Sequence, residues 1–185
     1  MNNSNLPPSF FRKTGDGTYE PTEATIGPWS SDFQHGGPPC SLLTHALSIF
    51  PSPEDLKIVR ITIEFFSAIP IKPCEIKIEN IRAGKKIELL RGQYISEGKT
   101  FLLAHAWRME SQMGITNPVS DGFKLPQLPR PQVQKSFPGI NYFPYLEALE
   151  WRFTEGALDK TGPGTVFDSK GNIGCSIHTL FVRPR

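Results

Sequence analysis

The sequence predicts an α+β fold in which an antiparallel sheet packs against one buried helix. Residues 40–50 are apolar at helical spacing on more than one face, which indicates a helix enclosed by other elements. The four segments that follow alternate polar and apolar residues, and this alternation is the period of half-buried strands. A helix packed against such a sheet is an α+β arrangement.

These elements follow one another in the first 110 residues. A first strand is expected around residues 19–26. The helix is expected over residues 40–50, because two prolines suit its first turn, where an amide hydrogen has no partner, and two further prolines end it (Pro38, Pro39, Pro51 and Pro53). Strands are expected at residues 58–66, 74–81, 86–95 and 100–110, joined by short turns into an antiparallel meander.

The clearest strand is "IVRITIEFF", residues 58–66. Its apolar residues alternate with Arg60, Thr62 and Glu64, so we expect one face to be buried: Val59, Ile61, Ile63 and Phe65.

The chain changes character after residue 110. Residues 111–144 are rich in proline without a sustained period, which predicts a linker. Residues 145–185 contain two stretches typical of strands, "LEALEWRFTEG" and "GNIGCSIHTLFV", but no second helix of comparable quality. We therefore expect an N-terminal domain over residues 1–110, a linker over 111–144 and a smaller unit over 145–185.

Composition excludes several classes of function. The formal net charge is +2 and the basic residues are dispersed, so neither nucleic acid nor an anionic membrane surface is an expected partner. No signal peptide and no stretch of 18 apolar residues is present, which favours a cytoplasmic protein without a membrane span. Three widely separated cysteines and no metal-ligand spacing favour reduced thiols, no metal site and no cofactor (Cys40, Cys74 and Cys175).

The order of a strand, a helix that begins at "HGGPP", the segment "IVRITIEFFSAIPIKPCEI" and a closing meander resembles the first half of the double-hotdog acyl-CoA thioesterase family. The similarity spans roughly residues 17–110 and resumes at "LEWRFTEGALDKTGPGT" and "DSKGNIGCSIHTLFVRPR". The resemblance implies a hotdog fold for the N-terminal domain, with the sheet wrapped around the helix. It also implies an incomplete second hotdog, which lacks its helix and several strands near Phe167 and Asp168.

The resemblance implies hydrolysis of an acyl thioester to a free acid and coenzyme A. Complete members of this family use an Asp on the second helix, a Thr or Ser on a following strand and a Gln on the last strand. The first two positions are absent from this chain, and His178 stands where the family has Gln, or Thr179 if the alignment shifts by one residue. The alternative function is a non-catalytic acyl-CoA binder or assembly partner. A third possibility is an internally deleted version of a longer protein.

The segment that carries over from the family is Gln34-His35-Gly36-Gly37. At the N-terminus of a buried helix, free amides and the helix dipole can polarise a thioester carbonyl. Pro38 and Pro39 lack an amide hydrogen, so the donors are expected at Gly36, Gly37 or the backbone of Cys40. The alternative is that both glycines only permit a tight turn and that His35 caps the helix.

A general base could be Asp32, His35 or His178. Asp32 and His35 are close enough in sequence to act as a pair. Cys40 lies in the first helical turn, where the dipole lowers the pKa of a thiol, so a Cys40 nucleophile with His35 as base is a further hypothesis. The alternative is that Cys40 is a small buried thiol.

Four residues are expected to contact substrate: Trp29, Phe33, Gln34 and Cys40. The aromatic residues among them, together with Phe65 and Phe66, would line an acyl channel or else belong to the core. A basic hairpin turn could bind the phosphates of coenzyme A or simply be a solvated surface (Arg82, Lys85, Lys86 and Arg91). An incomplete second unit leaves a sheet edge and apolar surface open, so we expect a homo-oligomer or pairing with another hotdog protein.

Overall fold

The computed structural model describes residues 6–52, 55–111, 130, 143–153, 165–167, 173–175 and 180–184. The chain divides into two units, residues 1–118 and residues 119–185. Within the described residues, the first unit contains one α-helix, one 3₁₀ turn and a six-stranded sheet, and the second contains one short helix and four short strands.

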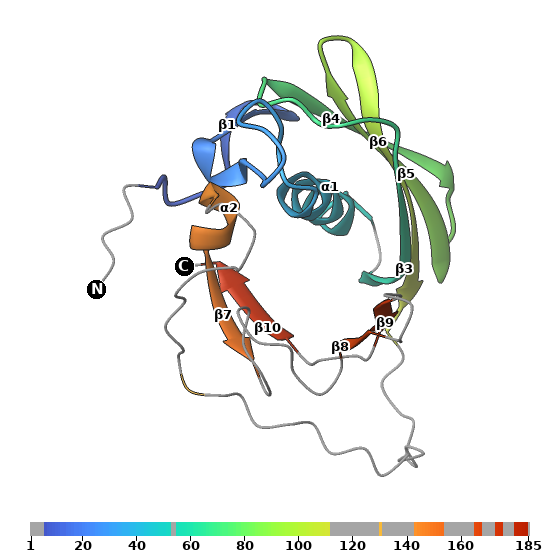
Figure 1. The fold of residues 1–185 in the computed structure, drawn as a ribbon. Coiled ribbons are helices and arrows are strands. Elements are labelled where there is room, and N and C mark those ends of the chain that lie inside the picture. Colours follow the sequence, from blue (N-terminus) through green and yellow to red (C-terminus); the bar gives the residue numbers. More distant parts are fainter. Residues whose placement is uncertain are drawn as a thin grey trace. The chain divides into compact units, whose positions relative to one another are not determined.

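The sheet of the first unit wraps around α1 (Gly37–Ser48), as Figure 1 shows. Its strands are β1 (Phe11–Gly15), β2 (Thr18–Pro21), β3 (Leu56–Phe65), β4 (Cys74–Arg82), β5 (Ile87–Ser96) and β6 (Lys99–Glu110). They lie in the order β1-β2-β4-β5-β6-β3, and every neighbouring pair is antiparallel. This is the helix and enclosing sheet that the sequence predicts.

Two expectations about the strands are wrong. Residues 19–26 do not form one strand, because β2 ends at Pro21 and a 3₁₀ turn, η1 (Glu23–Thr25), follows it. The four long strands do not form one meander either, because β3 pairs with β6 and only β4, β5 and β6 are sequential neighbours. The connection over residues 66–73 carries the chain from one side of the sheet to the other, so β3 and β4 are not adjacent.

A bulge in β3 changes which residues face the helix. The pairing with β6 shifts between Ile58 and Arg60, which leaves Val59 as the extra residue. Ile58, Ile61 and Ile63 consequently pack against the core, whereas the side chain of Val59 is 57% exposed. The expectation of a buried face is therefore wrong for Val59, and it is also wrong for Phe65, which is 52% exposed.

The inner face of β5 and β6 carries small residues where the helix crosses it. Gly92 lies opposite Ala104 in the register, and Leu90 lies opposite Ala106. A Cβ at Gly92 would lie 2.9 Å from Cδ1 of Leu43 on α1, so a larger residue there would require this leucine side chain to move. The core around this contact comprises Leu43, Ala46, Leu47, Ile69, Cys74, Ile76, Leu90, Tyr94, Phe101, Leu102, Ala104 and Ala106.

The second unit contains α2 (Pro144–Glu147), β7 (Leu149–Phe153), β8 (Thr165–Phe167), β9 (Ile173–Cys175) and β10 (Leu180–Pro184). β7 pairs antiparallel with β10, and β8 pairs antiparallel with β9. Asp168, His178 and nearly all of the expected linker lie outside the described residues. In the parts of the chain that the structure does describe, no helix is long and apolar enough to cross a membrane.

Candidate functional site

The segment that leads into α1 is fixed to two other parts of the first unit. The backbone amide of His35 donates to the carbonyl of Thr25 at 2.7 Å, and the amide of Gln34 donates to the carbonyl of Ile69 at 2.9 Å. Phe33 forms a β-bridge with Pro70. The N-terminus of the helix is thus held between η1 and the connection that precedes β4.

The Gln34 side chain is a buried clamp on this segment. It is only 4% exposed, and its Nε2 donates to the carbonyl of Pro70 at 2.7 Å and to the hydroxyl of Tyr94 at 3.0 Å. Its Oε1 has no partner among the described residues. Direct contact between Gln34 and a substrate would require these hydrogen bonds to open.

Tyr94 extends the clamp to β4. Its fully buried hydroxyl also hydrogen-bonds the thiol of Cys74, and burial raises the pKa of both groups, Cys74 and Tyr94, above their usual values. Both groups are therefore neutral near pH 7. The clamp links three parts of the unit through uncharged groups.

Three backbone amides at the start of α1 were expected to be available as donors, and two of them already have acceptors. The Gly37 amide donates to Nδ1 of His35 at 3.1 Å, and the Cys40 amide donates to the carbonyl of Gly36 at 3.2 Å. Pro38 and Pro39 have no amide hydrogen. Among the three expected donors, only the Gly36 amide has no acceptor within the described residues.

His35 caps the helix, which was the alternative to a catalytic role. Because its Nδ1 accepts the Gly37 hydrogen, the proton of the neutral ring lies on Nε2. Burial lowers the pKa of His35 below its usual value, which favours this neutral form. The ring stacks on Trp29, with centroids 5.7 Å apart and planes 11° apart. In this arrangement Nδ1 is not available as a base.

The aromatic side chains near the helix N-terminus lie at the surface and not in the core. Trp29 is 74% exposed, and three phenylalanines are between 37% and 58% exposed (Phe33, Phe65 and Phe66). Phe65 lies against Gly36, since a Cβ added there would be 3.1 Å from Cζ of its ring. A partly exposed aromatic ring therefore lies directly against Gly36.

Asp32 lines a surface depression with a volume of about 610 Å³. Its lining also includes Phe33, Pro70, Phe101 and an ion pair in which Lys72 Nζ lies 2.5 Å from Glu97 Oε1. His35 is not among the lining residues. The expected pairing of Asp32 with His35 thus gains no support from the shape of this cavity.

Cys40 does not have the pKa that its position in the helix suggests. The side chain is about half buried, and burial raises the pKa of its thiol. The expectation of a lowered thiol pKa is therefore wrong, because burial disfavours the charged thiolate. Cys40 is a protonated thiol at neutral pH, which disfavours it as a nucleophile.

Two of the four basic side chains at the hairpin already interact with other residues of the sheet. Arg82 donates to the carbonyl of Ile87 at 3.0 Å and lies 5.8 Å from the centre of the Trp107 ring. Arg91 pairs with Glu79 at 2.5 Å. Lys85 and Lys86 are exposed, so the turn has the character of a solvated surface.

Sequence reasoning missed two buried polar groups, the Gln34–Tyr94–Cys74 clamp and the Glu88–Arg108 ion pair. Glu88 lies in phase with Leu90 and Gly92 on β5, and Arg108 lies in phase with Ala106 on β6. Charged residues in the buried phase of two strands would have indicated an internal ion pair. Within the described residues, no group of three His, Cys, Asp or Glu side chains could hold a metal ion.

Comparison with known proteins agrees with this architecture. Residues 25–109 match the family described as acyl-CoA thioesterase N-terminal domain. No curated protein matches the chain in sequence.

Among solved structures, a hotdog-fold protein of unknown function from Alicyclobacillus acidocaldarius has a TM-score of 0.58 at 12% identity. Candidate thioesterases from Thermobifida fusca and Novosphingobium aromaticivorans each have a TM-score of 0.56, at 15% and 18% identity. All three matches cover 80% of this chain, but the chain spans only 53%, 56% and 59% of theirs. The fold is therefore a hotdog, as the resemblance implies.

Proposed function

We propose, from the premise that the chain belongs to the thioesterase-like hotdog family, that it binds an acyl-CoA or a related acyl thioester at the N-terminus of α1 and hydrolyses it. The Gly36 amide would donate to the carbonyl oxygen as negative charge develops on it. The α1 dipole favours that charge.

One observation carries the proposal: the Gly36 amide has no acceptor within the described residues, while its neighbours are engaged or lack hydrogens. Phe65 lies against Gly36 and Trp29 stacks on the neighbouring His35 ring, and these exposed aromatic side chains would accept part of an acyl group. Gly37 becomes a second donor only if the His35 ring turns away.

In the reaction, water oxygen bonds to the carbonyl carbon, the carbon–sulfur bond breaks and coenzyme A leaves as its thiol. A base must take the proton from water. Nδ1 of His35 does not do so in this arrangement, because it already accepts the Gly37 amide hydrogen. Asp32 and His178 are the candidates that remain from the sequence.

Release of coenzyme A thiol from short, medium and long acyl-CoAs tests the proposal. The Gly36→Pro variant deletes the donor, and Gly36→Ala keeps it while adding a similar Cβ. The φ of −63° at Gly36 suits both residues. We expect Gly36→Pro to lower kcat by about 10²- to 10³-fold, and Gly36→Ala to retain most of the activity. Equal turnover in both variants would contradict the oxyanion role.

The second candidate function is non-catalytic binding of acyl-CoA. The engagement of Nδ1 of His35 favours it, because the histidine nearest to Gly36 in sequence then lacks a free basic nitrogen. Equilibrium binding of a non-hydrolysable acyl-CoA thioether, without turnover of the matching thioester, would establish this function.

We also propose that the protein self-associates or pairs with another hotdog protein through β3. In the described part of the chain β3 is the last strand of its sheet, and Val59 and Phe65 on it are more than half exposed. We expect the sedimentation coefficient to rise with protein concentration, and a Val59→Lys variant to lower this dependence. A monodisperse monomer at all concentrations would contradict association.

A further inference from the structure

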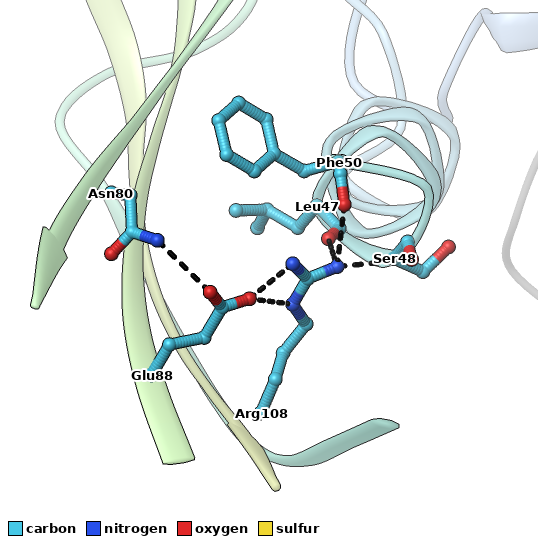
Figure 2. A network of polar contacts seen from close by, with 6 residues as sticks. All are labelled: Leu47, Ser48, Phe50, Asn80, Glu88 and Arg108. Carbon is cyan, nitrogen blue, oxygen red and sulfur yellow. Dashed lines mark hydrogen bonds and ion pairs between the residues drawn. The ribbon is translucent and has the colours of Figure 1, made fainter. Parts of the chain in front are cut away.

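A network of buried charged and polar groups lies at the C-terminal end of α1 (Figure 2). Arg108 on β6 and Glu88 on β5 are 2% and 3% exposed. The Nε of Arg108 donates to Oε1 of Glu88 at 2.6 Å, and its Nη2 donates to the same oxygen. Asn80 on β4 donates to the other carboxylate oxygen at 2.9 Å. Three adjacent strands thus hold the guanidinium of Arg108 in one orientation.

The remaining nitrogen of Arg108 binds the end of the helix. Its Nη1 donates to the carbonyl of Phe50 at 2.8 Å, and the carbonyls of Leu47 and Ser48 lie at 3.4 Å. The last carbonyls of a helix have no partner within it, and a positive charge there is favoured by the helix dipole. α1 ends at "SIFPSP" without a glycine, so an arginine some 60 residues away supplies the cap.

The hydrogen bonds from Arg108 to the carbonyls at the end of α1 are directional, whereas the apolar contacts between the helix and the sheet are not. The leucine side chains that pack on the inner face of the sheet make dispersion contacts, which have no fixed bond direction. A planar guanidinium held by a carboxylate has fixed donor directions, so a shift of one residue, about 1.5 Å, would break its bonds to the carbonyls.

We infer that Arg108 is a positioning residue, which fixes α1 along its axis from the C-terminal end and thereby sets where Gly36 and Gly37 lie. The helix has 12 residues, so its N-terminus is about 18 Å away. The importance of this position for catalysis rests on the proposed function, but the claim about the helix does not.

Two native cysteines allow a test that needs no enzymatic activity. Cys40 lies in the first turn of α1 and is half-buried, and Cys74 lies on β4 and is 4% exposed. In a Cys175→Ser background, each thiol is labelled with N-ethylmaleimide under native conditions and quantified by peptide mass spectrometry. Local displacement of the helix exposes Cys40 alone, whereas global unfolding exposes both thiols.

We expect Arg108→Met to raise the labelling rate of Cys40 at least tenfold relative to that of Cys74. The control Arg91→Met, which breaks the exposed pair with Glu79, should leave both rates unchanged. Parallel increases at the two cysteines, or an unchanged rate at Cys40, would overturn the inference.

If Arg108→Met does not fold, Arg108→Lys decides the question. Lysine keeps the charge but lacks the planar fork that joins Glu88 to the carbonyls. We expect selective labelling of Cys40 in this variant as well, and wild-type labelling would overturn the inference. In a catalytically active protein, the same variant should lower kcat with little change in KM. Absence of turnover in the wild type would refute only the proposed hydrolysis, because labelling is independent of it.

Discussion

The two ends of α1 are built from opposite kinds of residue. At the C-terminal end, Arg108 and Glu88 are almost fully buried, and Arg108 donates to the carbonyls that the helix leaves free. At the N-terminal end there are glycines and prolines, and the Gly36 amide has no acceptor within the described residues. The side chains beside it, Trp29 and Phe65, are largely exposed.

This difference separates anchoring from binding along a single helix. At the negative end of the dipole an internal arginine donates to the last helix carbonyls, but no acidic residue lies in the first turn at the positive end. The positive end therefore keeps its capacity to stabilise negative charge on a ligand. Substitutions at the C-terminal end should change stability most, and those at the N-terminal end should change stability least.

Arg108→Met should have the largest effect. It leaves Glu88 as an uncompensated buried charge and removes the donor from the carbonyls of Leu47, Ser48 and Phe50 at the end of the helix, so we expect the free energy of unfolding to fall by about 3–5 kcal/mol. Urea unfolding followed by circular dichroism measures this change. Arg91→Met removes an exposed ion pair and should lower the free energy of unfolding by at most about 1 kcal/mol.

The double variant Glu88→Met/Arg108→Met sharpens this prediction. Removing both charges eliminates the unpaired carboxylate, so part of the lost stability should return. Full recovery would contradict a role for Arg108 at the helix carbonyls, because those groups remain without their donor in the double variant.

Gly92→Ala should have the next largest effect, since Gly92 lies under the middle of the helix. The new Cβ would lie 2.9 Å from Leu43 Cδ1 and 3.2 Å from Leu47 Cδ2, so these leucine side chains must move. We expect the free energy of unfolding to fall by about 1–3 kcal/mol. Leu43→Ala combined with Gly92→Ala should show favourable coupling in a double-mutant cycle, and simple additivity would exclude this contact as the cause.

Periodicity in the sequence was sufficient to predict the helix and the four long strands, but not their order in the sheet. Alternation shows which face of a strand is buried and not which strand lies beside it. The place of β3 next to β6 depends on the 66–73 connection, whose hydrogen bonds involve distant residues such as Gln34. The bulge at Val59 shifted the phase of a strand that looked regular.

The site was predictable in its location and not in its hydrogen bonds. The segment from Gln34 to Gly37 stood out because glycines precede a buried helix, but which amide remains free depends on the ring orientation of His35. For Cys40, the position in the helix suggested a lowered pKa, whereas burial in the folded unit raises it. Burial is a property of the tertiary structure, so a sequence pattern cannot supply it.

Tyr94→Phe tests the clamp at the N-terminal end. It removes the hydroxyl that binds Gln34 and Cys74, but the Gln34 amide retains its bond to the carbonyl of Pro70. We therefore expect a loss of only about 1 kcal/mol in the free energy of unfolding, measured by urea denaturation. A loss as large as that for Arg108→Met would contradict the contrast between the two ends.

The smallest effect should be the pH dependence contributed by His35. Its pKa is lowered in the folded protein, whereas the unfolded chain has the usual value of about 6.5. Between these two values the unfolded state binds more protons, so the contribution to stability is complete above about pH 6.5 and declines as the pH falls toward the folded pKa. Protonation also removes the Nδ1 acceptor from the Gly37 amide.

As the pH is lowered from about 7.5 to about 5, a range that brackets the usual histidine pKa of about 6.5, the urea midpoint should decrease. We expect this decrease to be steeper for the wild-type protein than for His35→Asn. Asparagine can still accept from the Gly37 amide but does not titrate, and the other histidines contribute equally to both proteins. Identical slopes would mean that His35 is protonated in the folded protein as easily as in the unfolded chain. The cap on α1 would then not depend on the neutral form of the His35 ring.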